Sequence, residues 1–261
     1  MWCGDVVRNG IPQTVIERDS IPLHDAHRRF SPAMQFGIMA PMKLAALVPM
    51  RHHSQRVPGK NYRPLAGKPL FHHILETLLA VPEIETILVD TDSQPILSDL
   101  QRLFPRVVRI QRPEHLQADD VPMNDILLHD TAQVNTDFYL QTHSTNPLVK
   151  AETISRGIQA LFSNYPKHDS LFSVTRLQTR LYFADGRAVN HNPLELIQTQ
   201  DLPPVYDENS CMYIFTRENL VRRKHRIGAS PLMFEIDADE AWDIDEELDF
   251  EICDFLMRRK K

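Results

Sequence analysis

The 261-residue sequence has few cysteines, no excess of basic residues and no long apolar run. Its three cysteines, Cys3, Cys211 and Cys253, are widely spaced and odd in number, which argues against a disulfide framework or a cysteine metal site. No segment approaches the roughly 20 apolar residues needed to span a bilayer. The net charge of −6 gives no general attraction to nucleic acid or to anionic membranes. We therefore expect a cytoplasmic protein that binds neither, and an anionic ligand would need a local basic loop.

The first 41 residues differ from the rest of the chain. They mix proline, charge and isolated apolar residues without a sustained period, and they lack the apolar segment of a secretion signal. A regular pattern begins at Met42. We expect residues 1–41 to be a flexible extension or an artefact of the assigned start site. Residues 42–261 are enough for one sizeable α/β domain.

From Met42 onward, short apolar runs alternate with longer amphipathic segments. The runs predict strands at 44–48, 84–89, 107–110, 138–141, 170–175 and 211–215. The amphipathic segments predict helices at 69–80, 123–134, 151–162 and 246–257. This alternation favours a largely parallel sheet with helices on both faces. It lapses between 178 and 209, and we expect that segment to be an arm that covers substrate or contacts another subunit.

Three polar features have simple structural interpretations. Asp90-Thr-Asp-Ser93 could be a metal-binding Asp-x-Asp, but a strand end followed by a helix cap at Asp92 or Ser93 explains it more simply. The adjacent pairs His52-His53 and His72-His73 do not indicate zinc, because neighbouring side chains project differently. The basic run 222–226 is typical of a solvated helix end.

A basic loop follows the first predicted strand. It reads Pro49-Met-Arg-His-His-Ser-Gln-Arg-Val-Pro-Gly-Lys-Asn61 and places Arg51, Arg56 and Lys60 within ten residues. Open α/β sheets bind ligands outside the carboxyl ends of their strands, and such a loop can hold a triphosphate. It is not a Walker loop, because Gly-x4-Gly-Lys-Ser/Thr is absent. On composition alone, a solvated basic loop is an open alternative.

A pair of aspartates lies near the C-terminus, in Trp242-Asp-Ile-Asp-Glu-Glu-Leu-Asp249. In an extended segment Asp243 and Asp245 point to one side, with Ile244 turned into the core. Two hard carboxylates then form a site for Mg²⁺ that carries substrate phosphates. In a helix the two side chains would diverge by roughly 200°. The open alternative is acidic capping of the helix that begins near Glu246.

Both segments resemble the acylneuraminate cytidylyltransferases, the CMP-sialic acid synthetase family. The loop and the sequence after it match this family at Pro49, Arg51, Ser54, Pro58, Lys60, Asn61, Leu65, Gly67, Lys68, Pro69 and Leu70. The family has a similar Asp-Ile-Asp segment, and further matches occur at Arg112-Pro-x-x-Leu116-x-x-Asp119 and in 200–209. The chain departs from the family at His52, His53 and Gln55, and His143 stands where a Gln is usual.

The resemblance implies a three-layer, nucleotide-diphospho-sugar transferase-like (Rossmann-like) α/β fold with a mixed, mostly parallel sheet. It also implies transfer of CMP from CTP to the anomeric hydroxyl of an acidic nine-carbon sugar of the sialic-acid type, with release of pyrophosphate. Mg²⁺ would be the cofactor, and the protein would be a homodimer. The alternatives are a related nucleotidyl- or glycosyltransferase with another sugar or nucleotide, and a non-catalytic nucleotide-binding relative.

The same resemblance assigns roles to individual residues. Catalysis would depend on Arg51, Lys60, Asp243 and Asp245, of which the two aspartates bind the metal. The nucleotide would be bound by Arg51, Ser54, Lys60, Asn61 and Arg112. The sugar would lie toward His143, Thr145 and Asn209.

Overall fold

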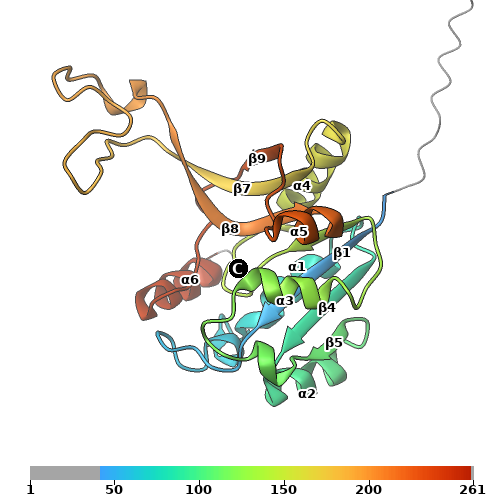
Figure 1. Ribbon diagram of the computed structural model, residues 1–261. Coiled ribbons are helices and arrows are strands. Elements are labelled where there is room, and N and C mark those ends of the chain that lie inside the picture. Colours follow the sequence, from blue (N-terminus) through green and yellow to red (C-terminus); the bar gives the residue numbers. More distant parts are fainter. Residues whose placement is uncertain (1–41, 260–261) are drawn as a thin grey trace, which may run out of the picture. The chain divides into compact units, whose positions relative to one another are not determined.

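The computed structural model describes residues 42–259, so the predicted N-terminal extension, residues 1–41, lies outside the described residues. A seven-stranded sheet in the order β5-β4-β1-β6-β8-β7-β9 forms the centre (Figure 1). Its strands are β1 Leu44–Met50, β4 Thr86–Thr91, β5 Val108–Gln111, β6 Phe138–Gln141, β7 Ser170–Leu177, β8 Val205–Phe215 and β9 Pro231–Glu235. A small hairpin is formed by β2 Pro64–Leu65 and β3 Lys68–Pro69. Within 42–259 every helix is too short or too polar to cross a membrane.

The sheet is mixed but mostly parallel. β1 pairs in parallel with β4 and β6, and β4 pairs in parallel with β5. β8 runs antiparallel to both of its neighbours, β6 and β7, whereas β9 is parallel to β7. All seven residues of β1 are buried, as expected for a central parallel strand covered on both faces. The predicted fold class is therefore confirmed.

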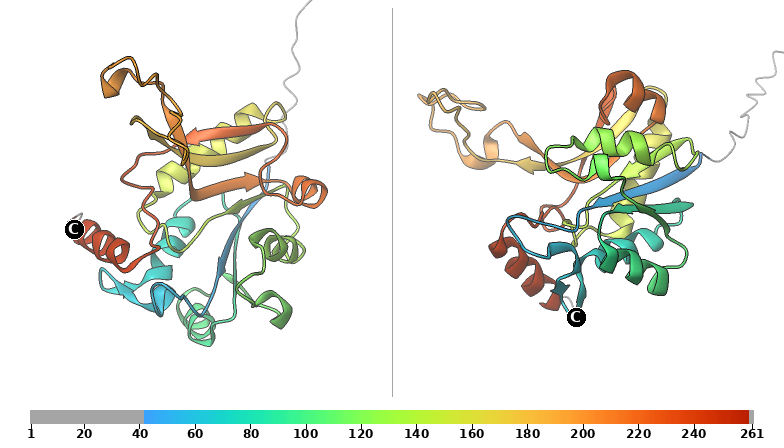
Figure 2. Two further views of the ribbon diagram at one scale, coloured as in Figure 1. Left: turned by 60° about the vertical axis from the view of Figure 1, so that its left-hand side comes forward. Right: turned by 60° about the horizontal axis from the view of Figure 1, so that its bottom comes forward.

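Helices cover both faces of the sheet (Figure 2). On β1, Ala46 and Val48 pack into a core with α1, α2 and α4, while Ala45 and Leu47 pack into a second core with α3 and α5. Successive residues of a strand point to opposite faces, so the unbroken apolar run of β1 supplies both cores. The helices of the described residues are α1 Leu70–Leu79, α2 Gln94–Leu103, α3 Met123–Asp130, α4 Ala151–Asn164, α5 Arg217–Arg223 and α6 Glu247–Arg259.

The structure adds elements that the pattern did not predict and moves some boundaries. α5, β9 and the β2–β3 hairpin were not predicted, and α3 ends at Asp130 rather than at 134. β8 begins at Val205, six residues before the predicted start, because its first residues pair with the end of β7. The irregular segment between the two strands is 178–204, which we call the arm. In Figure 1 the arm extends away from the sheet.

A buried carboxylate fixes the start of α4. Glu240 is 1% exposed and accepts hydrogen bonds from the Lys150 backbone N–H at 3.0 Å, from Lys150 Nζ at 2.8 Å and from Thr153 Oγ1 at 3.1 Å. Burial by itself raises the pKa of Glu240, but the hydrogen bonds from Lys150 and Thr153 outweigh it and hold the pKa below its ordinary value. Glu240 thus ties the segment after β9 to the helix that follows β6.

Replacing Glu240 by alanine should lower the free energy of unfolding by about 2–3 kcal/mol, because hydrogen bonds to a charged group contribute about 1.5–3 kcal/mol. Urea unfolding followed by circular dichroism at pH 7 measures this change. Since the pKa of folded Glu240 is depressed, its contribution is complete above the ordinary pKa and is lost as the pH falls through the folded value. The difference between wild type and variant should therefore shrink below about pH 4.

The matched control is Asp239→Ala, at the exposed neighbouring position, which should change stability by less than about 0.5 kcal/mol. An equal loss in both variants would contradict the anchoring role of Glu240.

Candidate active site

The candidate site lies at the carboxyl end of β1, where the strand order changes direction. The chain passes from β1 to β4 on one side, and β6 lies on the other side of β1. Open α/β sheets bind ligands in the crevice at such a point. The segments after β1 and β6 meet there. Ser144 Oγ donates to Asn61 Oδ1 at 2.6 Å, and Asn61 Nδ2 donates to the Arg51 carbonyl at 2.7 Å.

A polar pocket of about 440 Å³ opens at this crevice. Its walls come from the basic loop after β1, from the segment after β6, and from Asp119 and Met123. The structure brings together in this pocket six of the residues expected to bind nucleotide or sugar, namely Arg51, Ser54, Lys60, Asn61, His143 and Thr145.

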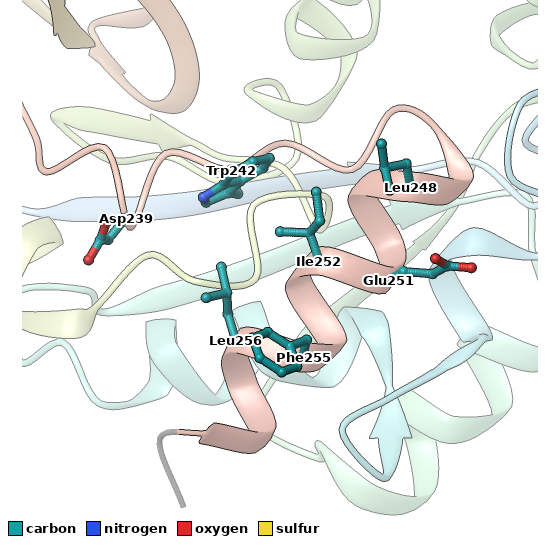
Figure 3. Close-up of a pocket in the computed structure, with 7 residues that line it drawn as sticks. All are labelled: Asp239, Trp242, Leu248, Glu251, Ile252, Phe255 and Leu256. Atoms are coloured by element: carbon teal, nitrogen blue, oxygen red, sulfur yellow. The ribbon is translucent and has the colours of Figure 1, made fainter.

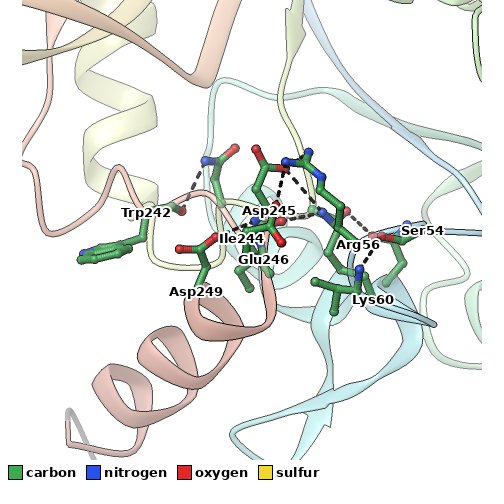
Figure 4. Close-up of polar contacts among 12 residues, drawn as sticks. Ser54, Arg56, Lys60, Trp242, Ile244, Asp245, Glu246 and Asp249 are labelled. Atoms are coloured by element: carbon green, nitrogen blue, oxygen red, sulfur yellow. Dashed lines mark hydrogen bonds and ion pairs between the residues drawn. The ribbon is translucent and has the colours of Figure 1, made fainter.

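The paired aspartates adjoin the pocket. Ile244 between them is fully buried, as expected for an extended segment, and its N–H donates to the Thr145 carbonyl at 2.9 Å. Lys60 Nζ donates to the Ile244 carbonyl at 2.5 Å and lies 3.9 Å from Asp245 Oδ1 (Figure 4). Arg56 also reaches this carboxylate, with 2.7 Å between Arg56 Nη2 and Asp245 Oδ1. The basic loop and the acidic segment thus form one site.

Helix capping is performed by a different aspartate of the same segment. Asp249 Oδ2 accepts hydrogen bonds from the backbone N–H groups of Asp245 at 3.0 Å and Glu246 at 2.8 Å. It therefore caps the start of α6, where a negative charge is favourable. The side chains of Asp243 and Asp245 are not needed for this purpose.

The chemistry of Asp243 and Asp245 fits a divalent cation. Asp243 Oδ1 is buried and accepts no hydrogen bond from the described residues. Burial raises the pKa of Asp243, against the opposing effect of a hydrogen bond from Thr145. A buried carboxylate oxygen without a donor calls for a cation, and two adjacent hard carboxylates suit Mg²⁺.

The cations of the basic loop are held by acidic partners. Arg51 Nη1 lies 3.0 Å from Asp119 Oδ1, and Gln55 Nε2 donates to Asp119 Oδ2 at 2.8 Å. Burial lowers the pKa of Lys60, although Asp245 and Asp243 oppose this shift. Lys60 is thus a partly desolvated cation that an anionic ligand would stabilise.

Two of the residues expected to bind nucleotide or sugar, Arg112 and Asn209, do not line the pocket. Arg112 is 2% exposed, and its Nε donates to Asp90 Oδ1 at 3.2 Å. Asn209 accepts from Ser173 Oγ at 2.6 Å and donates to Thr175 Oγ1 at 2.9 Å, which ties β8 to β7. In this structure both side chains are engaged within the protein.

Comparison with known proteins identifies the family. Residues 45–259 match the family described as Cytidylyltransferase. The chain belongs to this family. It is therefore a nucleotidyltransferase, and the resemblance drawn from the basic loop and the paired aspartates is confirmed.

Curated relatives match along most of the chain. A CMP-N,N'-diacetyllegionaminic acid synthase of Legionella pneumophila is 30% identical over 83% of this chain and 97% of its own length. The Post-translational flagellin modification protein B of Campylobacter coli is 26% identical over 80% of this chain and 93% of its own length. An N-acylneuraminate cytidylyltransferase of Escherichia coli is 23% identical over 84% of this chain, which spans only 53% of that relative.

Solved structures share the fold. A CMP:2-keto-3-deoxy-manno-octonic acid synthetase complexed with CTP has a TM-score of 0.64 and 17% identity, over 84% of this chain and 100% of its own. A 4-diphosphocytidyl-2C-methyl-D-erythritol synthase has a TM-score of 0.60 and 16% identity, over the same shares of the two chains. At these identities the likeness establishes the fold alone.

In the cytidylyltransferase, the two histidines of the basic loop have different surroundings. The His52 backbone N–H donates to Asp92 Oδ1 at 2.7 Å, and its Nδ1 lies 2.8 Å from Ser93 Oγ. Ser93 precedes α2 but makes no side-chain capping bond, so the predicted cap contacts the loop instead. The His52 ring stacks on Tyr62, with 5.4 Å between ring centroids, whereas His53 lines the pocket.

Hydrogen bonds connect His143 to a partly buried cation, Arg226, that the sequence did not predict. Gln141 Nε2 donates to His143 Nε2 at 2.8 Å, and Arg226 Nη1 donates to Gln141 Oε1 at 2.6 Å. The Arg226 guanidinium also lies 3.5 Å from the centre of the Tyr213 ring. The interpretation of 222–226 as a solvated helix end is wrong for Arg226, because Lys224 adopts a left-handed conformation after α5 and Arg226 points inward.

A second, apolar hollow of about 530 Å³ lies along α6 (Figure 3). Its lining is mainly apolar, with Trp242, Leu248 and Phe255 prominent, and its charged residues are the acidic Asp239 and Glu251. This hollow lacks the cations that a triphosphate requires. The polar pocket at β1 is therefore the candidate active site.

His143 should remain neutral between pH 5 and pH 8. Burial, reinforced by the positive charges of Arg226 and Lys60, lowers the pKa of His143 to about 3. In NMR spectra of histidine-labelled protein, one imidazole assigned by His143→Gln should show no titration between pH 5 and pH 8. A midpoint of the His143 resonance inside that interval would contradict the assigned environment.

Proposed function

We propose that this cytidylyltransferase transfers CMP from CTP to the anomeric hydroxyl of a sialic-acid-type, nonulosonic sugar and releases pyrophosphate. The observation that carries the proposal is the meeting of Lys60 and Arg56 with Asp245 at the edge of the polar pocket. The names of the relatives support the sugar class, since they include a CMP-N,N'-diacetyllegionaminic acid synthase and an N-acylneuraminate cytidylyltransferase.

The charge balance of the site supports a requirement for Mg²⁺. Arg51, Arg56 and Lys60 each face a carboxylate within 4 Å, so the site has little positive charge to spare for a triphosphate. Mg²⁺ held by Asp243 and Asp245 would restore that charge and would polarise the phosphate that is attacked. Asp243 Oδ1, which accepts no hydrogen bond from the described residues, would then be a ligand of the metal.

The residues of the chain would act by position and charge. Lys60 is held by the Ile244 carbonyl, so its ammonium can stabilise charge that develops on the phosphate oxygens. Arg51, released from Asp119, would bind the same oxygens, and the Ser54 hydroxyl would donate to them. The attacking group is the sugar hydroxyl, and the bond to pyrophosphate breaks as the new P–O bond forms. No covalent enzyme intermediate is required.

The sugar would lie toward His143 and Thr145. Because His143 Nε2 accepts from Gln141, the neutral ring carries its proton on Nδ1 and offers one donor. Arg226, half-buried behind Gln141, supplies positive charge. This arrangement favours an anionic substrate that presents a hydrogen-bond acceptor to the His143 ring.

The central test is pyrophosphate release from CTP, Mg²⁺ and a panel of sialic, legionaminic, pseudaminic and Kdo-type sugars. At least one sugar should react, and Asp245→Asn should reduce turnover about 100-fold or more, because an amide is a poor ligand for Mg²⁺. Glu246→Gln is the matched control, since Glu246 also faces Arg56, at 3.4 Å, and should keep most of the activity.

Circular dichroism would confirm that both variants are folded. Normal turnover in Asp245→Asn would refute the metal assignment. A preference for UTP or GTP would indicate a related nucleotidyltransferase, and CTP binding without pyrophosphate release for any sugar would indicate a non-catalytic relative.

We also propose that the protein is a homodimer joined through the arm. The arm exposes an unusual amount of apolar surface, with Leu194 93% exposed, Leu196 94% exposed and Tyr182 54% exposed. Clustered exposed apolar side chains of this kind mark contact surfaces. In the sequence, the regular alternation of strands and helices lapses between 178 and 209. The proposal explains this lapse, because most of that segment forms the arm.

Sedimentation equilibrium should show a dimer that Leu196→Asp weakens about 100-fold or more in Kd, since a symmetric dimer buries this leucine twice and each burial contributes about 1.5–3 kcal/mol. Thr199→Asp adds the same charge at an exposed polar position of the arm and should leave the dimer intact. A monomeric wild type, or equal weakening by both substitutions, would refute this interface.

A further inference from the structure

A second group of ionisable side chains lies where β4 ends and α3 ends. Asp90 is on β4, and His129 and Asp130 are the last two residues of α3. Both carboxyl groups are fully buried, and the His129 side chain is 23% exposed. One potential ligand atom from each residue lies within 4.8 Å of the others. None of the three residues lines the polar pocket.

The hydrogen-bond partners of this group are incomplete. Asp90 Oδ1 accepts from Arg112 Nε at 3.2 Å. Asp90 Oδ2 and Asp130 Oδ2 are buried and accept no hydrogen bond from a donor in the described part of the chain. Arg112 neutralises Asp90, whereas the partner of Asp130 is the His129 imidazole rather than a permanent cation. Two like charges this close cannot both remain ionised unless a cation joins them, so the space between them holds either a proton or a metal ion.

The proton is the competing explanation. Without a cation, burial and the negative charge of Asp90 raise the pKa of Asp130 to about 9, so Asp130 would be a neutral acid that hydrogen-bonds Asp90. In that explanation the adjacent imidazole is only a hydrogen-bond partner of Asp130. His129 Nδ1 lies 3.3 Å from Asp130 Oδ1 and 4.0 Å from Asp90 Oδ2. Ligand atoms of a tetrahedral zinc site are about 3.3 Å apart, as follows from metal–ligand distances of about 2.0 Å.

We propose that Asp90, His129 and Asp130 bind a divalent transition-metal ion, Zn²⁺ or Mn²⁺, at a site separate from Asp243 and Asp245. One imidazole with two carboxylates is a ligand set that such ions accept. Arg112 holds Asp90 through Oδ1 and leaves Oδ2 for the metal, in the way that outer hydrogen-bond partners orient metal ligands. The carboxyl end of α3 adds the negative end of a helix dipole, which favours a cation.

The ion would have a structural role. It would join β4 to α3 and fix Arg112, from which the chain continues to Asp119, the partner of Arg51 in the polar pocket. The ion takes part in no chemical step, and the proposal is independent of which sugar the enzyme uses.

The test uses the full chain, stripped of metal with a chelator and then titrated with Zn²⁺ alone or Mn²⁺ alone. Elemental analysis after desalting should find one equivalent per chain with the preferred ion. Saturation at about 100 times Kd should raise Tm by about 5 °C or more. Asp130→Asn keeps the shape and the hydrogen bond of a protonated carboxyl but is a poorer ligand, so this variant should lose both the bound ion and the metal-dependent rise in Tm.

Three further variants make the result decisive. Asp125→Asn, at an exposed position of α3, should retain the ion, and Asp243→Asn with Asp245→Asn should retain it as well. His129→Gln tests the same site at a partly exposed residue if Asp130→Asn does not fold, and it should also lose the ion. If wild type binds no stoichiometric Zn²⁺ or Mn²⁺, or if Asp130→Asn and His129→Gln bind as much as wild type, the proposal is overturned and the protonated pair is the correct description.

Discussion

The hydrogen bond from Lys60 to the Ile244 carbonyl is the contact on which the active site depends, because it joins segments 184 residues apart. Ile244 is buried, and its N–H is held by Thr145 from the segment after β6. One buried apolar residue therefore fixes the basic loop, the segment after β6 and both flanking aspartates relative to each other. The pocket is defined where these three segments meet.

The same contact explains why the site can exist without a ligand. Lys60 and Arg56 satisfy Asp245 from one side, and Asp119 holds Arg51 from the other. Charges without partners in a partly desolvated site are costly, and each of these cations is paired with a carboxylate. Under the proposed function, phosphate binding would be an exchange of partners rather than the burial of new, unpaired charge. Among the described residues, none donates a hydrogen bond to Asp243 Oδ1 in this arrangement.

The sequence predicted most of the strands of the sheet. It also singled out the basic loop and the paired aspartates, which the structure brings together. Both predictions rest on local patterns. β1 and β6 are short apolar runs, and the Asp-Ile-Asp alternation places Ile244 in the core by itself. The failures concern long-range contacts. β9 begins with a proline and lies beside β7, so its pairing is not visible in its own residues. Arg226 differs from its basic neighbours only after the left-handed turn at Lys224 directs it inward. Arg112 matched a family motif that implied nucleotide binding. In the fold it pairs instead with Asp90, which lies 22 residues earlier in the chain and outside that motif.

Polar side chains at the end of β4 and just after it point to two different parts of the molecule. Asp92 accepts a hydrogen bond from the His52 backbone and so supports the basic loop, while Asp90 is buried with Arg112 and Asp130. A helix cap accounts for neither contact, since Ser93 bonds His52 rather than the helix. Asp90, Asp92 and Ser93 are therefore explained by tertiary partners: Asp92 and Ser93 contact His52 in the basic loop, and Asp90 holds Arg112. Substitutions at Asp90 would then act on the polar pocket only through Arg112 and the segment that leads to Asp119.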